Sequence, residues 1–547
     1  MLNRRNFLKT AAAGAFGLSV PIKVLPSRRQ SRGYFTVHPF IENHPEAVFI
    51  MPTHVDHRLN TAAKIEAGLI FGKSVFVPGD ENGIPLSISI PVKMNLKTTD
   101  AGKYPVDDIM GCVTDPWFAE GVYESLQKLG IPGKNIHLRE NPRGTSFETY
   151  GILDMAERAG IDFRNDFSGD VGDDMEPGRD FNWTNVPNGV FFREIPHLEP
   201  INTPNTWLLN MAKFKAHGMG LTLCSKNLQG LMTRPFCRLC ARIDSDMGLS
   251  PHLQDNALKA IQSSYERHVA EHIIPRWDKP GQNGGSWQEV WTHRTLDNLS
   301  VTPRGLNIIE GIYGRDGDGG NNGPHPFDAV NNTDDSSKGV TVQDFMSNYI
   351  IFGKDTFRTD IIGHWLGGHE PGNFGYFHLA IERGMSNALD PMKIPVYLWG
   401  NGSATLTPLY QFNRTPLLTY YLQRDYKGQI EPQYHLCDEP FDYRLVDGIE
   451  QLSQPEKPEV IVLYQGKANP YNHHASLEYR LPMSGYVRLE ISDNTGRLLD
   501  VPVDGFRSFG AHMTLWDIQN RASGSYSYRL RINGYEHKDH LNLQRQS

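Results

Sequence analysis

Cysteine is scarce in this chain. Its 547 residues include 5 cysteines, which are widely spread rather than regularly spaced. They are Cys112, Cys224, Cys237, Cys240 and Cys437. A scaffold held together by disulfides needs a denser and more regular set, so the sequence excludes that class of fold. Hydrophobic cores must therefore stabilise the protein.

Long hydrophobic runs and a positive net charge are also missing from the sequence. Beyond the N-terminal region, no apolar run reaches the roughly 20 residues that a membrane-spanning helix needs, so we expect no transmembrane anchor in the mature chain. The net charge is -8, which gives no overall attraction to nucleic acid. The hydrophobic fraction of 39% and the length indicate globular domains, more than one.

The first residues have the form of an export leader. Arg4 and Arg5 precede a short, weakly apolar stretch rich in Ala and Gly. This pattern predicts a twin-arginine signal peptide over residues 1–27, with an ordinary secretory leader as the alternative. We therefore expect the twin-arginine export machinery as a partner. The mature protein would then function in the periplasm, on the cell surface or outside the cell.

The region after the leader alternates strand and helix patterns. Apolar residues alternate with small ones over Leu86–Val92, which predicts a strand, and Lys93 and Asn95 follow at its end. Asp115 is a good N-cap for a helix, and a second strand is predicted over residues 135–140. Strand, helix and strand in this order are typical of a parallel sheet covered by helices.

The same alternation continues downstream. Further strands are predicted over residues 190–195, 207–211, 306–309 and 348–352, and further helices over 145–159, 255–273, 356–366 and 374–383. Residues 278–287 are predicted to be a loop. We therefore predict an α/β domain over residues 28–450, with a mixed, mostly parallel sheet as its core and helices on its faces.

The most distinctive stretch of the sequence is residues 208–234. Its polar side chains with functional potential are Lys213, Lys215, His217, Ser225, Lys226 and Asn227. Alternate residues of a strand share one face, so the first three would point the same way. The Gly-rich run that follows offers donors of the kind found in anion-binding loops. A solvated surface strand is the alternative.

Strand ends of open α/β sheets are where ligands bind. If the strand that ends near Lys93 is a neighbour of the basic strand, their lysines converge on a crevice suited to a carboxylate or phosphate. Glu310, at the end of a predicted strand, would enter the same crevice. We assign ligand binding to Lys93, Asn95, Lys215, Ser225, Asn227 and Glu310, and catalysis to Lys213, Lys226 and His217. His217 would be the acid or base. The alternative is that the lysines face solvent.

Three cysteines are candidate ligands for a cofactor. Cys237 and Cys240 have C-x-x-C spacing, and Cys224 adds a third thiolate for zinc or an iron–sulfur cluster. Twin-arginine export carries folded proteins, which favours a cofactor inserted before export. A disulfide formed after export and plain buried thiols are the alternatives.

The last part of the chain has a different character. Residues 451–458 are polar and Pro-rich and are interpreted as a linker. Short alternating strands follow, over residues 475–481, 486–491, 497–503, 512–516 and 524–532. They predict a β-sandwich over residues 459–547.

Four stretches of the first domain resemble the DUF362 family, a bacterial and archaeal group whose biochemical role is unassigned. They are Val92–Leu96, Thr114–Pro116, Leu209–Gly230 and the region from Leu306 to Pro371. The third is the most specific: it resembles the family's N-x-P-K-x-K-x-H segment, with Ala212 in place of the Pro. Many members carry a ferredoxin-like cysteine cluster, which this chain lacks. The resemblance implies no reaction.

The tail resembles the C-terminal sorting domain of type IX secretion substrates, akin to the FlgD-type immunoglobulin-like module. The resemblance lies in Asn469–Asn472, Tyr479–Pro482, Gly485–Leu489, Trp516–Asp517 and Tyr526–Leu530. It implies an immunoglobulin-like sandwich and the type IX secretion machinery as a partner. An adhesion or docking module is the alternative.

The sequence favours an exported enzyme that acts on an anionic small molecule through a crevice lined by Lys and His, by a reaction that the residues do not specify. The alternative is a non-catalytic cell-surface protein, binding or structural, displayed through its C-terminal module.

Overall fold

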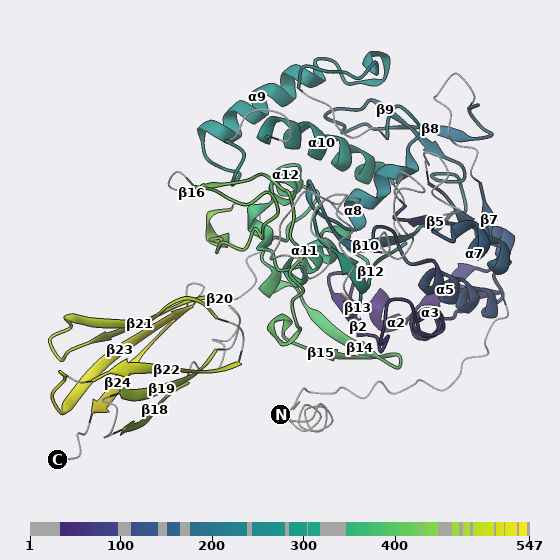
Figure 1. Ribbon diagram of the computed structural model, residues 1–547. Coiled ribbons are helices and arrows are strands. Elements are labelled where there is room, and N and C mark those ends of the chain that lie inside the picture. The colour runs from purple at the N-terminus through teal and green to yellow at the C-terminus, as the bar shows by residue number, and fades with distance from the viewer. Residues whose placement is uncertain are drawn as a thin grey trace, which may run out of the picture. The chain divides into compact units, whose positions relative to one another are not determined.

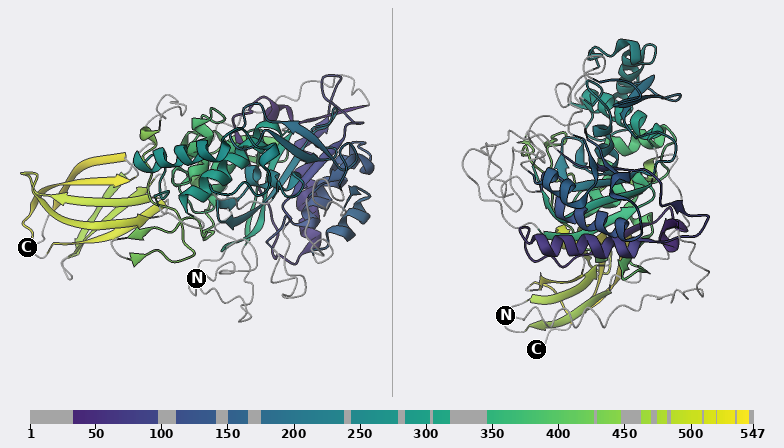
Figure 2. Two further views of the ribbon diagram at one scale, coloured as in Figure 1. Left: turned by 90° about the horizontal axis from the view of Figure 1, so that it is seen from above. Right: turned by 90° about the vertical axis from the view of Figure 1, so that its right-hand side faces the viewer.

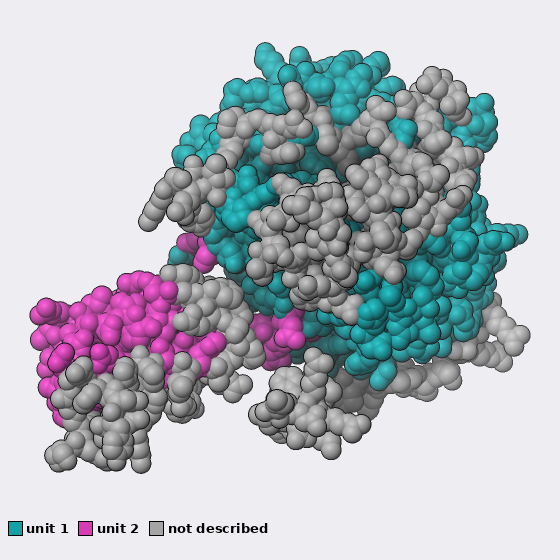
Figure 3. Space-filling model, in the orientation of Figure 1, with its two compact units in different colours: residues 1–407, 414–439, 443–449 teal, residues 408–413, 440–442, 450–547 magenta. Residues whose placement is uncertain are grey.

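The computed structural model describes residues 33–96, 111–140, 150–164, 175–237, 243–278, 284–302, 305–317, 346–426, 429–446, 462–469, 474–481, 485–507, 510–518, 520–532 and 535–543. The predicted leader and the predicted linker at residues 451–458 lie outside these ranges. The chain forms two compact units, coloured separately in Figure 3. Residues 1–407, 414–439 and 443–449 make up the first unit, and residues 408–413, 440–442 and 450–547 the second. Among the described residues, no helix has both the length and the apolar character to cross a membrane.

A ten-stranded mixed sheet forms the centre of the first unit (Figure 1). Its order is β15-β14-β2-β13-β12-β10-β5-β6-β7, and β11 pairs with β10. Parallel pairing joins β12, β10, β5, β6 and β7 in succession. The bounds are β2 (Val48–Pro52), β5 (Ile90–Met94), β6 (Ile136–Leu138), β7 (Asp162–Phe163), β10 (Leu209–His217), β11 (Gly220–Thr222), β12 (Leu306–Arg315), β13 (Met346–Gly353), β14 (Val396–Gly400) and β15 (Ser403–Leu406). The predicted mixed sheet is confirmed.

Helices cover both faces of this sheet (Figures 1 and 2). The α-helices are α2 (Pro39–Glu42), α3 (Thr61–Val75), α5 (Pro116–Lys128), α7 (Ile152–Ala159), α8 (Cys224–Asn227), α9 (Ala257–Ala270), α10 (Gly285–Val301), α11 (Thr356–Leu366) and α12 (Gly375–Glu382). One face packs on α3, α5 and α7 through a large apolar core, and α8 and α11 contact strands of the same sheet. The flanking helices that the sequence predicts are therefore present.

Two glycines let α3 and α5 pack closely. A Cβ atom on Gly68 would lie 2.1 Å from the Phe118 carbonyl oxygen, and one on Gly121 would lie 2.1 Å from the Ile65 carbonyl oxygen. Any larger residue at either position would push the helices apart. The pair forms a firm layer under the strands that carry the candidate site.

Shorter elements complete the first unit. Small sheets join β1 (Tyr34–Val37) with β3 (Phe76–Pro78) and β4 (Ile84–Pro85), β8 (Phe181–Asn185) with β9 (Glu194–Leu198), and β16 (Asp425–Tyr426) with β17 (Gln429–Ile430). Single turns of 3-10 helix lie at Gly133–Asn135, Leu228–Leu231, Ser250–His252, Pro371–Asn373, Pro391–Lys393 and Tyr443–Leu445.

Two sequence predictions in this unit are wrong. The strand predicted over residues 190–195 begins later, as β9 (Glu194–Leu198). The backbone N–H groups of Val190, Phe191 and Phe192 donate to the Asp297 carboxylate rather than to a neighbouring strand. The end of the loop predicted over residues 278–287 is the start of α10.

The described part of the second unit is rich in strands. One sheet has the order β18-β19-β22 and the other β21-β20-β23-β24. The bounds are β18 (Val462–Asn469), β19 (His474–Leu481), β20 (Gly485–Ser492), β21 (Leu498–Arg507), β22 (Gly510–Asp517), β23 (Gly524–Ile532) and β24 (Tyr535–Leu543). Leu477 and Trp516 of the first sheet share an apolar core with Leu489 and Leu530 of the second. The immunoglobulin-like assignment stays a prediction.

Candidate binding site at the ends of β5, β10 and β12

Three parallel strands bring the predicted site residues to one edge of the sheet. β10 pairs with β5 on one side and with β12 on the other, both in parallel. Parallel neighbours end at the same edge of a sheet. Lys93, Asn95, Lys213 and Glu310 therefore gather there, and the expected neighbour relationship of β5 and β10 is confirmed.

Lys213 is neutralised by a buried partner. Its Nζ lies 2.6 Å from Glu310 Oε2, and both side chains are 0% exposed. The same carboxylate accepts the backbone N–H groups of Asp115 and Ile312. Lys213 Nζ also lies 3.8 Å from the centre of the Tyr313 ring. Burial lowers the pKa of Lys213 and raises that of Glu310. The opposite charges of Lys213 and Glu310 therefore neutralise each other.

A second buried ion pair lies beside the first. Lys64 of α3 lies 2.7 Å from Asp115 Oδ2, and both side chains are 0% exposed. The Tyr313 hydroxyl donates to the same oxygen at 2.6 Å. The other oxygen of Asp115 accepts the N–H groups of Trp117 and Phe118, which caps α5 as the sequence predicts. Nothing in the sequence around Lys64 distinguishes it from a surface lysine.

Lys93 is paired in the same manner. Its Nζ lies 2.5 Å from Glu140 Oε2 and 3.0 Å from Asn227 Oδ1. Burial lowers the pKa of Lys93, and the Glu140 carboxylate opposes this effect. Gly230 leaves room for the pair, because a Cβ atom there would lie 1.9 Å from Glu140 Oε1 and 2.6 Å from Lys93 Cε.

Four asparagines join the three strands through amide hydrogen bonds. Asn210 Nδ2 of β10 donates to Asn307 Oδ1 of β12 at 3.0 Å. Asn227 Nδ2 of α8 donates to Asn210 Oδ1 at 2.9 Å. Asn95 Nδ2 donates to Asn227 Oδ1 at 3.3 Å. We call these residues the amide chain. The sequence pointed to Asn95 and Asn227 but not to the other two.

Asp360 of α11 fixes the start of α8. Its carboxylate accepts the backbone N–H groups of Cys224 at 2.7 Å and Ser225 at 2.9 Å, and also the Ser225 hydroxyl. Burial raises the pKa of Asp360 to about 7, although these hydrogen bonds act in the opposite direction. Ser225 therefore positions the turn that carries Lys226 and Asn227.

His217 and Lys226 lie against the same aromatic ring. Among the residues from 209 to 233, they are the two titratable side chains that are partly exposed. The His217 ring meets Trp291 edge to face at 5.1 Å and lies 6.1 Å from Tyr420. Lys226 Nζ lies 6.0 Å from the centre of the Trp291 ring. A cation and an imidazole thus flank one indole.

The three alternating basic residues of β10 have different neighbours. Lys215 is buried, and its ammonium group donates to the Cys112 carbonyl. Lys213 pairs with Glu310, and the register of β10 against β12 shifts between these two lysines. His217 is the last residue of β10 and contacts Trp291 instead. The side chains therefore do not converge on one partner.

Two elements that the sequence did not reveal surround His217. Gln288 of α10 donates to the Gly218 carbonyl at 2.7 Å. The described residues 415–426 and 429–439 form a segment that we call the strap. It passes the end of β10, where the Thr419 hydroxyl donates to the carbonyl oxygens of His217 at 2.6 Å and Gly220 at 2.8 Å. Tyr420 belongs to the same strap.

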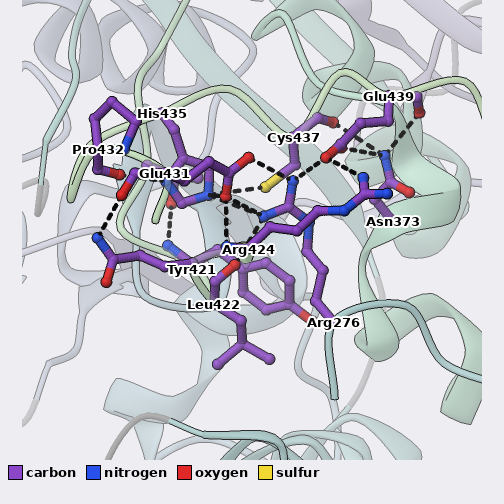
Figure 4. Close-up of polar contacts among 12 residues, drawn as sticks. Arg276, Asn373, Tyr421, Leu422, Arg424, Glu431, Pro432, His435, Cys437 and Glu439 are labelled. Atoms are coloured by element: carbon purple, nitrogen blue, oxygen red, sulfur yellow. Dashed lines mark hydrogen bonds and ion pairs between the residues drawn. The ribbon is translucent and has the colours of Figure 1, made fainter. Parts of the chain in front are cut away.

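A partly buried charge cluster anchors the strap (Figure 4). Arg276 donates to Glu431 at 2.7 Å, to Glu439 at 2.5 Å and to the Leu422 carbonyl at 2.8 Å. Asn373 donates to Glu439 at 3.2 Å. Without a partner, burial would disfavour the charged forms of Glu431 and Glu439. Here the single guanidinium group of Arg276 pairs with both carboxylates.

A metal centre does not emerge from the described residues. No group of three His, Cys, Asp or Glu side chains within the described ranges could hold an ion. Cys224 is fully buried, its thiol lies 3.6 Å from the Ile308 carbonyl, and burial raises its pKa well above the usual value. Cys237 is partly exposed, and Cys240 lies outside the described residues. The zinc or iron–sulfur site stays a prediction.

A known domain family matches the part of the chain that carries the candidate site. Residues 90–362 match the model of DUF362, described as a domain of unknown function. The match spans β5, β10 and β12 and therefore all of the strands that carry the site. No curated protein matches the chain.

Proposed function

We propose that this chain, which belongs to the DUF362 family over residues 90–362, binds an anionic small molecule at His217 and Lys226. One observation carries the proposal: His217 and Lys226, the two partly exposed titratable side chains among residues 209–233, both lie against the Trp291 ring. An ammonium group attracts a carboxylate or phosphate, and an imidazole can gain or lose a proton near neutral pH. Lys93 and Lys213 hold the edge of the sheet through buried pairs instead.

For the reaction, we propose proton transfer to or from the bound anion by His217. The Trp291 ring and Tyr420 restrict how the imidazole can turn, which suits a general acid or base. Lys213 is a positioning residue that supports β10 from the buried interior, because its complete burial separates it from any ligand.

The alternative is a binding protein without catalysis. The burial of Lys213 favours it, since one of the predicted catalytic groups has no exposed surface. The two functions differ in the fate of the ligand: an enzyme returns a changed molecule, whereas a binding protein releases the same one.

The test is a screen of small carboxylates and phosphates against the purified full chain, with thermal unfolding as the readout. We expect stabilising compounds for the native chain, and a loss of most of that stabilisation in Lys226→Ala and His217→Ala. Lys128→Ala is the matched control, because Lys128 is a surface lysine that pairs with Glu124 on α5. If all three variants retain the native response, the site is elsewhere.

We also propose export of the chain by the twin-arginine route and sorting through its second unit. The paired Arg4 and Arg5 support export. The two strand-rich sheets support an immunoglobulin-like sorting module. Deleting residues 459–547 should leave the protein inside the outer membrane. Surface delivery of the shortened chain would refute the sorting role.

A further inference from the structure

The amide chain ends in an acceptor for which the described part of the chain supplies no donor. Asn95 is 8% exposed, and among the described residues none donates to its Oδ1 atom. The rest of the residue is firmly held, because its N–H donates to Thr114 Oγ1 at 2.8 Å and its carbonyl accepts the Thr114 N–H at 2.9 Å. The carbonyl oxygen of the side chain is therefore a fixed feature of the site.

The orientation of the Asn95 amide follows from its neighbours. Asn227 Oδ1 accepts from Lys93 Nζ, and Asn227 Nδ2 donates to Asn210 Oδ1. Asn227 can therefore offer only its oxygen to Asn95, so Asn95 must present Nδ2 to it. A reversed amide at Asn95 would place two acceptors against each other. The unfilled atom at the end of the amide chain is thus an oxygen.

An acceptor in this position calls for a donor. Nearly all buried polar side chains in folded proteins are hydrogen-bonded. Amides aligned in a chain polarise one another, which strengthens the terminal acceptor. The Asn95 oxygen also lies at the carboxyl end of a parallel strand, where open sheets bind ligands.

We propose that Asn95 Oδ1 receives a hydrogen bond from the ligand, and that the ligand is a small anion that also carries a hydroxyl or ammonium donor. This inference rests on the proposed function. Asn95 Nδ2 donates to Asn227, and Asn227 follows Lys226 directly in α8, so the residue that carries the acceptor contacts the helical turn that carries the proposed anion contact. The donor and the charged group of the ligand would lie on either side of it.

The test compares matched probes on the full chain. Propionate, lactate and alanine share a carboxylate and differ in having no donor, a hydroxyl donor or an ammonium donor on the second carbon. Ethyl phosphate and phosphoethanolamine form the corresponding phosphate pair. A probe with a donor should bind about 3- to 10-fold more tightly than its partner without one, as expected for one added hydrogen bond. The stronger of lactate and alanine identifies the donor.

Two variants assign the preference to Asn95. In Asn95→Ala the preference should disappear, so that matched probes bind equally. Asn210→Ala breaks the same amide chain two links away but leaves the Asn95 oxygen in place, and the preference should persist there. Equal loss in both variants, or full preference in Asn95→Ala, would overturn the inference.

A crystal structure of the full chain soaked with the preferred probe gives a second readout. We expect a hydroxyl or ammonium group of the probe within hydrogen-bond distance of Asn95 Oδ1. A bound probe whose donor lies elsewhere, with only water at this oxygen, would contradict the inference while leaving the proposed function intact. Failure of the proposed function would give a different result, because the probes would then bind to Lys226→Ala as well as they bind to the native chain.

Discussion

The Lys213 ammonium group lies 2.6 Å from the Glu310 carboxylate, and neither side chain is exposed to solvent. The pair joins β10 to β12 at the edge of the sheet where the candidate site lies. A buried charge without its partner is far costlier than a buried pair. We therefore infer that Lys213 and Glu310 support the site structurally.

Removal of either member of this pair should destabilise the first unit strongly. We expect Lys213→Met and Glu310→Gln each to cost about 3–5 kcal/mol, because each leaves one charge or polar group buried without its partner. Urea unfolding followed by circular dichroism measures this loss. The double variant removes both charges and should recover much of the stability. Additive losses in the double variant would show that the two residues act independently.

Asp360 should control the order of α8. Asp360→Ala leaves the N–H groups of Cys224 and Ser225 without their acceptor, at a cost of about 1–3 kcal/mol. Hydrogen exchange at these two amides of α8 should accelerate more than exchange in the strands of the central sheet. Asp355→Ala is a useful comparison, since Asp355 caps the start of α11 by accepting the Arg358 N–H. Unchanged exchange at both amides would contradict this role.

His268 should make stability depend on pH in the alkaline range. Its two ring nitrogens lie 3.0 Å from Glu289 and 2.7 Å from Glu382, and both must be protonated to donate. Burial alone would lower the pKa of His268, but the hydrogen bonds to the two glutamates outweigh it and raise the pKa to about 9. The ordinary value is 6.5.

Because the folded-state pKa is the higher one, this stability is complete below pH 6.5 and is lost as the pH rises through 9. The loss should be on the order of 2 kcal/mol, since solvent screens the partly exposed Glu382. Unfolding measured between pH 6 and 10 tests it. His268→Gln should flatten the profile in this window, and an unchanged slope would contradict the assignment.

The strap should loosen when Arg276 is replaced. Arg276→Lys keeps the charge but cannot reach Glu431 and Glu439 together in the same planar geometry. We expect faster hydrogen exchange over the strap in Arg276→Lys and a larger effect in Arg276→Ala. Arg193→Ala is the control, because Arg193 forms an exposed pair with Asp255 elsewhere in the same unit. Equal exchange in all three variants would show that the cluster does not hold the strap.

The elements best predicted from the sequence are those with a local signal. Asp115 followed by Pro116 marks the start of α5, and α11 has the bounds Thr356–Leu366 that the pattern predicts. α10 gave no such signal, because it is buried on all sides and therefore lacks a separate apolar stripe. Its polar residues are satisfied by distant partners such as the Gly218 carbonyl and the backbone at Val190.

The candidate site was predicted in outline and not in its pairing. The alternation of Lys213 and Lys215 located the right strand, but their partners Glu310 and Cys112 are about one hundred residues away in the sequence. Long-range pairing decides which lysines are neutralised, and spacing along one strand carries no information about it. Trp291 was not predicted for the same reason, because its contacts with His217 and Lys226 join distant parts of the sequence.

The most direct test of the account is a crystal structure of the full chain with an anionic ligand found in the screen. We expect the carboxylate or phosphate of the ligand to lie within hydrogen-bond reach of Lys226 Nζ, beside His217 and the Trp291 ring, with the Lys213–Glu310 pair intact behind it. An anion bound away from Lys226, or one that separates Lys213 from Glu310, would contradict the account.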